Sequence, residues 1–250
     1  MAICPNLRWW ILSALLVTVV LSSFWLPPSL RQASRVELDS FYSGFGGWVD
    51  ESLGQFFEHS ELLILAAHSH LDNASAVLEF GCGDGSFADE LLSAYLPSTA
   101  SYRGLELSQR RAEEANSRLK RFGERTIAIC QDAISFDVVD GSVDRVLSTF
   151  VIDLLSYQQI DLFLAESRRA LAKDGLLCLS SLSFGQGLWS FSGVIAALWN
   201  AVHTFSPALV GGCRPLDLFE VLNRNSVAWE VIFIHQSTWL PFESVVARKL

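Results

Sequence analysis

The stretch "VLEFGCGDGSF", residues 77–87, decides the fold. Its apolar start predicts a buried strand, the acid Glu79 stands near the end of that strand, and glycines follow at positions 81, 83 and 85. Glycine lets the backbone turn sharply and approach a ligand without a Cβ in the way. A helix beginning near Ser86 would aim free N–H groups at the same place. The stretch therefore predicts a strand, a ligand-binding loop and a helix in succession.

Strand and helix patterns alternate through the rest of the chain. The predicted strands are residues 76–80, 102–107, 126–132, 143–150, 175–183, 229–235 and 242–250. The predicted helices are residues 60–71, 86–96, 108–123, 159–172 and 215–225. This alternation predicts an α/β fold with a Rossmann-like, doubly wound, mostly parallel sheet of seven strands. Only a short link joins the last two strands, so we expect them to pair as an antiparallel hairpin at the sheet edge.

The composition narrows the class of protein. Of 250 residues, 50% are hydrophobic and 18% charged, and the formal net charge is −9. An acidic chain is a poor partner for nucleic acid, and none is expected. The five cysteines are widely spaced, odd in number and without a CxxC pair, so the sequence suggests neither a metal site nor a disulfide framework. A reducing compartment fits this pattern best.

A charge-free apolar segment, "WWILSALLVTVVLSSFWL", occupies residues 9–26. As a helix it would reach roughly 27 Å, close to the hydrocarbon thickness of a bilayer. Tryptophans at both ends suit the two membrane interfaces, and Pro27 and Pro28 would end the helix. The rival interpretation is a cleaved signal peptide, although no A-x-A-like cleavage site follows. We expect a single-pass transmembrane anchor within residues 1–30.

The glycine loop and three acids indicate the class of ligand. The dinucleotide fingerprint G-x-G-x-x-G would need a third glycine where Ser86 stands, and the G-K-[ST] of a P-loop is absent. Glu79 would repel a pyrophosphate but suits a cationic or hydroxyl-bearing ligand. Glu106 ends the second strand, where a carboxylate can accept from ribose hydroxyls, and Asp132 ends the third, where it can accept from an adenine amine. Each acid alone could be a solvated turn residue, and together they favour a nucleoside site.

Five motifs resemble those of class I S-adenosylmethionine-dependent methyltransferases, in particular the type 11-like group that includes quinone-biosynthesis and lipid enzymes. They are "VLEFGCGDGSF", "GLELS", "CQDA", "DGSVDRVLSTFVIDLLS" and "AESRRALAKDGLLCL". The resemblance covers about residues 60–183 and implies S-adenosyl-L-methionine as the cofactor. It implies these cofactor-binding residues: Glu79, Gly81, Cys82, Gly83, Glu106, Leu107, Asp132, Ala133, Ser148 and Thr149. The single glycine Gly175 departs from the family, which often has two there.

By this resemblance the chain is a methyltransferase with a domain at residues 60–250, preceded by a linker and cap at 31–59. Methyl transfer from a sulfonium needs mainly alignment and exclusion of water, so no obligatory catalytic residue is evident. Asp153 and His203 are candidates for a general base. Asp153 could instead cap a helix, and His203 could simply be packed on one.

The apolar segment at 187–202 lies within a predicted lid or interfacial insert, residues 187–213. Leu188, Phe191, Ile195, Leu198 and Val202 share one helical face. That face could pack on the sheet, cover a hydrophobic acceptor or contact a membrane. Arg214 follows near the expected mouth of the site, where it could meet an acidic group of a substrate or an internal carboxylate.

The function expected is methylation of a small, hydrophobic or membrane-derived acceptor. Because the cofactor is made in the cytosol, the domain is expected on the cytosolic side of the membrane. The alternative is a non-catalytic membrane protein that binds S-adenosylmethionine or its product as a sensor or scaffold. An NAD-linked reductase is disfavoured by Ser86.

Overall fold

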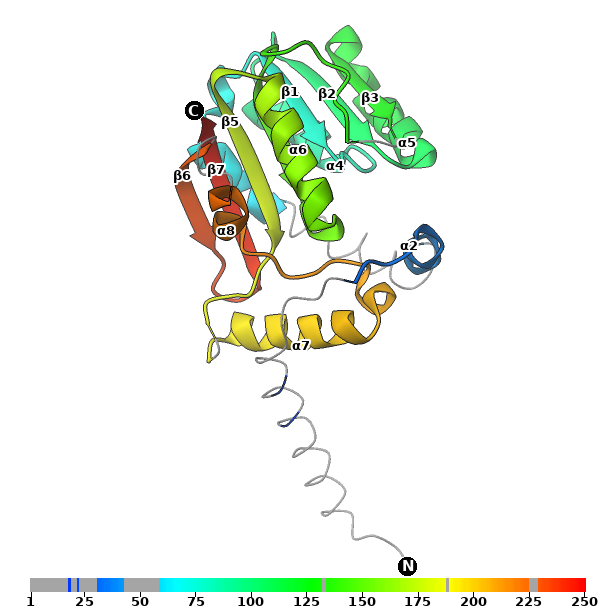
Figure 1. The fold of residues 1–250 in the computed structure, drawn as a ribbon. Coiled ribbons are helices and arrows are strands. Elements are labelled where there is room, and N and C mark those ends of the chain that lie inside the picture. Colours follow the sequence, from blue (N-terminus) through cyan, green and yellow to red (C-terminus); the bar gives the residue numbers. More distant parts are fainter. Residues whose placement is uncertain are drawn as a thin grey trace, which may run out of the picture.

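The predicted strands form one sheet in the order β3-β2-β1-β4-β5-β7-β6 in the computed structural model (Figure 1). The structure describes residues 31–42, 59–131, 134–187, 189–224 and 229–250, together with Thr18 and Ser22. The strands are β1 Ala76–Phe80, β2 Ser101–Glu106, β3 Thr126–Cys130, β4 Val143–Thr149, β5 Leu171–Leu182, β6 Trp229–Gln236 and β7 Phe242–Lys249. The sheet predicted from the alternation is confirmed.

The order of the strands reverses beside β1, and this reversal positions the site. β1 pairs in parallel with β2 on one side and with β4 on the other. In such sheets a ligand binds outside the carboxyl ends of the strands at this switch point. β7 pairs antiparallel with both β5 and β6, which confirms the predicted hairpin at the edge.

Helices cover both faces of the sheet because each carries an apolar stripe. The longer ones are α2 Arg35–Tyr42, α5 Gln109–Leu119, α6 Tyr157–Ala170 and α7 Phe191–Phe205, and the shorter ones are α4 Ser86–Glu90 and α8 Leu218–Asn223. One core cluster joins residues 59–68, α4 and α5 to the sheet. The other joins α6 and α8 to the opposite face. The chain thus buries both faces of a mostly parallel sheet, as its apolar strands require.

Capping residues set where two of these helices begin. Ser108 accepts a hydrogen bond from the Arg111 amide at the start of α5. Ser156 and Gln159 form a reciprocal capping box at the start of α6. Such caps satisfy backbone donors that an isolated helix end leaves free. The start of α5 after Ser108 therefore agrees with the prediction from the sequence.

Helix α7 does not lie against a face of the sheet. Figure 1 shows it across the end of the molecule, beyond the carboxyl end of β5. Its buried positions are Ser192, Gly193, Ala196, Ala197, Asn200 and His203. Phe191 and Val202, from the predicted apolar face, are exposed instead. Ile195 and Leu198, from the same predicted face, are half-buried, and small residues such as Gly193, Ala196 and Ala197 are fully buried on the inner side.

The predicted membrane anchor, residues 9–26, lies outside the described residues except for Thr18 and Ser22. In the part of the chain that the structure does describe, no helix combines the length and apolar character needed to cross a membrane. Leu188, which was assigned to the apolar face of α7, is also outside the described residues.

Candidate functional site

The loop after β1 passes very close to the segment that follows β4. Gly81 adopts φ 81°, a conformation that favours glycine. Its amide donates to the carbonyl of Leu105 on β2 at 2.7 Å. A Cβ on Gly81 would overlap the side chain of Val151. Glycine is thus required here by the conformation and by the neighbour.

Gly83 has open space where a side chain would stand. Its φ is 56°, and the nearest atom to a built Cβ is Nη1 of Arg111, 3.9 Å away. The Gly83 amide donates to Oε2 of Glu106 at 3.0 Å, and Oε1 of Glu106 accepts from the Ser108 amide at 2.9 Å. A carboxylate oxygen has a second lone pair, so Glu106 can hold the loop and still accept from a ligand.

Most amides of this loop are already bonded within the protein. The Cys82 amide donates to the carbonyl of Leu105 and the Gly85 amide to that of Cys82. The Ser86 amide donates to Oδ1 of Asp84 at 3.0 Å. The expectation of free N–H groups is therefore wrong for Ser86. The loop offers a ligand space and a nearby carboxylate more than unpaired donors.

Glu79 and Cys82 are buried beneath the loop. Glu79 is 1% exposed and accepts a hydrogen bond from the Tyr102 hydroxyl at 2.5 Å. Burial, together with the charge of Glu79, raises the pKa of Tyr102 well above its usual value, so Tyr102 remains the donor. The Cys82 side chain fills the space above Gly104, and burial raises its thiol pKa. Cys82 can therefore face a ligand only through its backbone.

The other expected cofactor residues lie around the same edge of the sheet. Ser148, fully buried, donates from its hydroxyl to the carbonyl of Phe80 at 3.1 Å, and Thr149 beside it is 8% exposed. Leu107, directly after β2, is 54% exposed. Asp132 and Ala133 lie outside the described residues. The structure thus brings Gly81, Gly83 and Glu106 together, with Ser148 tying β4 to the end of β1.

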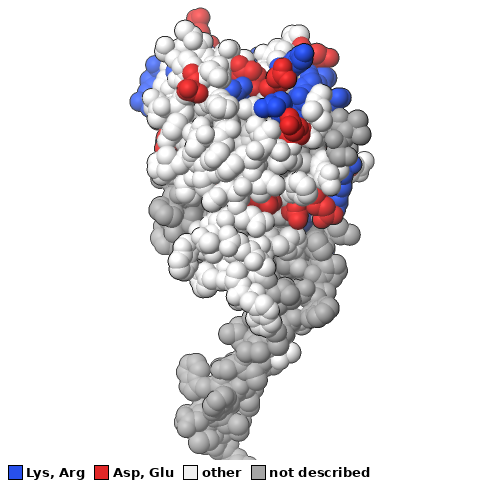
Figure 2. Space-filling model, turned by 90° about the vertical axis from the view of Figure 1, so that its left-hand side faces the viewer, with Lys and Arg blue, Asp and Glu red and all other residues white. Residues whose placement is uncertain are grey.

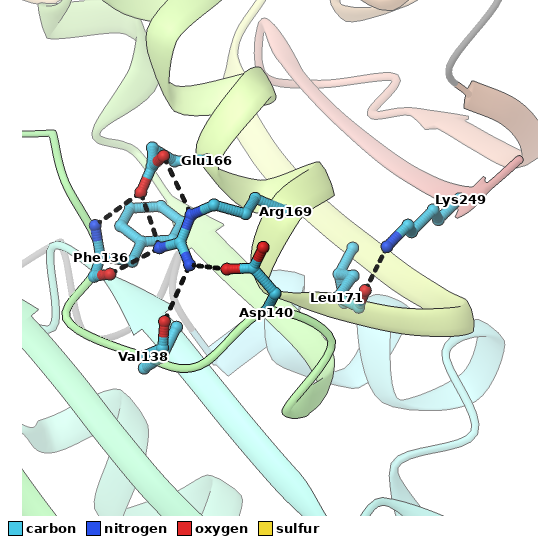
Figure 3. Close-up of polar contacts among 7 residues, drawn as sticks. All are labelled: Phe136, Val138, Asp140, Glu166, Arg169, Leu171 and Lys249. Atoms are coloured by element: carbon cyan, nitrogen blue, oxygen red, sulfur yellow. Dashed lines mark hydrogen bonds and ion pairs between the residues drawn. The ribbon is translucent and has the colours of Figure 1, made fainter.

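Arg169 on α6 holds the chain that follows β3 (Figure 3). Its guanidinium donates to the backbone carbonyls of Phe136 at 2.7 Å and Val138 at 2.8 Å. It also pairs with Asp140 at 2.6 Å and Glu166 at 2.9 Å. These bonds use both ends of the planar guanidinium, so residues 136–140 are anchored on α6.

The two candidate bases lie on either side of one turn. The Arg214 amide donates to the carbonyl of Asp153 at 3.2 Å, and Nε2 of His203 is 3.1 Å from the carbonyl of Gly212. Both candidate side chains are fully buried. Burial raises the pKa of Asp153 to about 6 and lowers that of His203. Asp153 also accepts from the Leu182 amide through Oδ2, so its side chain joins β5, whereas the N-cap of α6 is Ser156.

Sequence reasoning missed two residues of this site, Tyr102 and Val151. Tyr102 pairs with Val77 in the sheet register and reaches Glu79 two residues along the neighbouring strand. Side chains two apart on a strand share a face, so the register would have indicated this contact. Nothing local marks Val151 as the neighbour of Gly81.

Comparisons with known proteins agree with this geometry. A family model described as "Methyltransferase domain" matches residues 77–175. A malonyl-[acyl-carrier protein] O-methyltransferase of Geobacter sulfurreducens is 34% identical over 128 residues, which are 51% of this chain and 45% of the relative. A sphingolipid C9-methyltransferase of Candida albicans is 24% identical over 183 residues, 71% of this chain and 34% of the relative. The chain spans less than half the length of both curated relatives.

A solved structure has the same fold. It is a Thermotoga maritima protein titled "SAM-dependent methyltransferase, possible histamine N-methyltransferase", with a TM-score of 0.60 and 20% identity. The alignment covers 87% of this chain and 100% of that protein. At this identity the likeness shows the architecture alone.

Proposed function

Because the chain belongs to the class I S-adenosylmethionine-dependent methyltransferases, we propose that it transfers a methyl group from this cofactor to a hydrophobic acceptor. The observation that carries the proposal is the bond between Gly83 and Glu106, 3.0 Å long, at a position where a built Cβ has no atom closer than Nη1 of Arg111 at 3.9 Å. It joins a carboxylate suited to ribose hydroxyls to a loop open enough for a ligand.

In this proposal the cofactor-binding residues are those expected from the sequence. Glu106 accepts from the ribose hydroxyls, and Gly81 and Gly83 leave room for the methionine part. Asp132 and Ala133 read the adenine, and Leu107 borders it. Ser148 and Thr149 line the end of β4 next to the amino-acid part. The residues present fit the cofactor because Gly83 leaves open space and Glu106 keeps unused lone pairs.

Methyl transfer needs few catalytic groups from the protein. The bound cofactor supplies an electrophilic methyl group on a sulfonium. The protein has to hold the acceptor atom in line with that methyl and exclude water. In this proposal Asp153, two residues beyond the Val151 that contacts the glycine loop, is the candidate base for a proton of the acceptor. Its pKa of about 6 suits a base near neutral pH.

An apolar surface supports a hydrophobic acceptor. Residues 175–213 contain no Lys, Arg, Asp or Glu. In Figure 2, the part of the surface around α7 carries no charged side chains. Large apolar side chains are exposed there, namely Trp189, Phe191, Phe205, Leu209 and Trp239. One of the two curated relatives is named for a lipid acceptor, a sphingolipid, and the other for malonyl-[acyl-carrier protein].

Attachment to the membrane through residues 9–26, with the domain on the cytosolic side, is part of the same proposal. Arg31 donates to the carbonyls of Thr204 and Phe205, at the carboxyl end of α7. Five residue steps separate Leu26 from Arg31, which allow about 17 Å at most. If residues 9–26 span the bilayer, α7 lies close to its surface. A lipid-derived acceptor could then reach the site without crossing water.

The test is cofactor binding followed by product identification. Calorimetry with the full chain should show binding of S-adenosylmethionine and of S-adenosylhomocysteine. Incubation with methyl-labelled cofactor and fractionated cell lipids should then transfer label to an apolar fraction, which mass spectrometry identifies. A chain that binds neither compound is not a methyltransferase of this class. A chain that binds both but labels no fraction would favour the sensor or scaffold.

A further inference from the structure

One edge of the Arg214 guanidinium is buried and has no hydrogen-bond partner. Arg214 is 2% exposed, and neither Nε nor Nη2 has a hydrogen-bond partner. A buried charged group without partners is costly, and such groups are rare in native proteins. An anionic group of a ligand could pair with this edge, which has no acceptor of its own in the protein.

The same edge of other arginines in this chain binds carboxylates. Arg121 donates from Nε and Nη2 to the two oxygens of Asp89, at 3.0 and 2.7 Å. Arg169 donates from the same pair of atoms to Glu166, at 3.2 and 2.9 Å (Figure 3). Two parallel N–H groups match the two oxygens of a carboxylate or phosphate. The unbonded edge of Arg214 thus has the shape of an oxyanion site.

The neighbours of Arg214 hold it in place and leave that edge without a hydrogen bond. The guanidinium stacks on the ring of Tyr157, 4.9 Å from its centroid. An electrostatic interaction with Asp153 partly balances its charge, yet both donors of the edge stay unbonded. Of the six buried polar side-chain atoms without partners in the described residues, four belong to Asp153, His203 and Arg214. Unsatisfied polar atoms are therefore concentrated in this group.

This group lies next to the cofactor loop. Asp153, whose carbonyl accepts from the Arg214 amide, is two residues beyond Val151, the neighbour of Gly81. Its side chain accepts from Leu182 at the end of β5. The backbone of Arg214 is thus bonded to the segment that follows β4, and Asp153 joins that segment to the end of β5.

We propose that the Nε and Nη2 atoms of Arg214 bind a carboxylate or phosphate group of the methyl acceptor. This inference rests on the proposed function. Together with the charge-free segment 175–213, it makes the acceptor an amphiphile with an anionic head group. The apolar part lies toward α7, and the head group pairs with Arg214.

The test uses the full chain in detergent, saturated with S-adenosylhomocysteine, and calorimetric titration with chemically simple probes. Decanoate should bind at least tenfold more tightly than decanol. Arg214→Gln should remove this preference, and Arg214→Lys, which keeps the charge but not the fork, should retain only part of it. Arg224→Gln is the matched control, because Arg224 also stacks on the Tyr157 ring, 4.6 Å from its centroid, but is exposed and paired with Glu220. It should leave the preference intact.

Acetate and inorganic phosphate test whether the bound anion is a free small ion or the head group of an amphiphile. Weak binding of both, compared with decanoate and decyl phosphate, supports an amphiphile. Binding of acetate as tight as that of decanoate would support the oxyanion edge but overturn the amphiphile.

Three results would overturn the assignment to Arg214. They are equal affinity of the wild-type chain for decanol and decanoate, an equal loss in Arg224→Gln, and a tenfold loss of S-adenosylhomocysteine affinity in Arg214→Gln. The last result would mean that Arg214 binds the cofactor rather than the acceptor. The first needs no variant, so the inference stays testable even if Arg214→Gln does not fold. Failure of the proposed function is distinct, because it would appear as no binding of S-adenosylhomocysteine by the wild type.

Discussion

The carboxylate of Glu106 accepts a hydrogen bond from the Gly83 amide at 3.0 Å, so the end of β2 and the loop after β1 are held together. Its other oxygen accepts from the Ser108 amide at the start of α5. One side chain thus sets the relative position of two loops at the switch point of the sheet. Disturbing it should affect the ligand site before it affects the core.

Glu106→Ala should weaken binding of S-adenosylmethionine by about 1.5–3 kcal/mol, the range for hydrogen bonds to a charged group. The reason is the loss of both the ribose contact and the restraint on Gly83. Calorimetry measures the effect. Glu114→Ala is the control, because Glu114 is on the outer side of α5 and pairs only with Arg110 among the bonds described. If the affinity of Glu106→Ala is unchanged, another residue binds the ribose hydroxyls.

Gly83→Val should abolish cofactor binding while the fold survives. The new side chain would occupy the open space beside the loop, and a positive φ in a non-glycine residue costs roughly 1–2 kcal/mol. Gly141→Val is the matched control, since Gly141 also has a positive φ and no atom closer than 3.9 Å, but lies far along the chain in the turn before β4. The melting temperatures of both variants should fall by similar amounts. Normal cofactor binding by Gly83→Val would mean that the glycine serves only the turn.

Gly81→Ala should behave differently from Gly83→Val. Its Cβ would overlap Val151, and both backbones are held by sheet hydrogen bonds nearby. We therefore expect a large loss of folded protein, measured by denaturant titration. Val151→Ala in the same chain should restore part of the stability, because it removes the overlapping methyl groups. If Gly81→Ala alone is as stable as the wild type, Gly81 and Val151 do not approach each other as closely as described.

Asp153→Asn should stabilise the protein at neutral pH. The folded-state pKa of Asp153 is raised to about 6 from 3.8, so the folded protein binds this proton more tightly than the unfolded chain does. The contribution of Asp153 to the free energy of unfolding is complete below about pH 4 and is lost as the pH rises through 6. The substitution removes that loss, by up to about 3 kcal/mol at pH 7–8.

The difference between Asp153→Asn and wild type should shrink as the pH is lowered from 8 to 5, which denaturant titrations at several pH values can follow. Asp161→Asn, an exposed position on α6, is the control. A difference that does not vary with pH would show that packing, not charge, decides the effect.

Arg169→Gln should destabilise the fold by about 1–3 kcal/mol, because it removes the donor of the Phe136 and Val138 carbonyls and the ion pair with Glu166. Arg168→Gln, next to it but exposed, should change stability by less than about 0.5 kcal/mol. Denaturant titration compares the two. Equal effects would mean that the contact in Figure 3 contributes little.

Much of this protein follows from sequence patterns alone. Apolar runs separated by helical periodicity identified the seven strands, and the spacing of glycines at 81, 83 and 85 placed a ligand loop after the first of them. Ser108 marked the start of α5 by its side-chain chemistry. These features are local: strand and helix preferences, turn conformations and caps depend on residues a few positions apart, so they can be recognised without knowing the fold.

Tertiary structure alone decided the contacts between distant segments. The Tyr102–Glu79 bond depends on the register of two strands, and the contact of Gly81 with Val151 depends on how two loops pack. The inner side of α7 is made of small residues rather than its most apolar ones, because the helix crosses the end of the sheet instead of covering a face. Likewise, Arg214 is recognisable as basic from the sequence, but its buried edge without a hydrogen bond exists only because Tyr157 and Asp153 are brought to it by the fold.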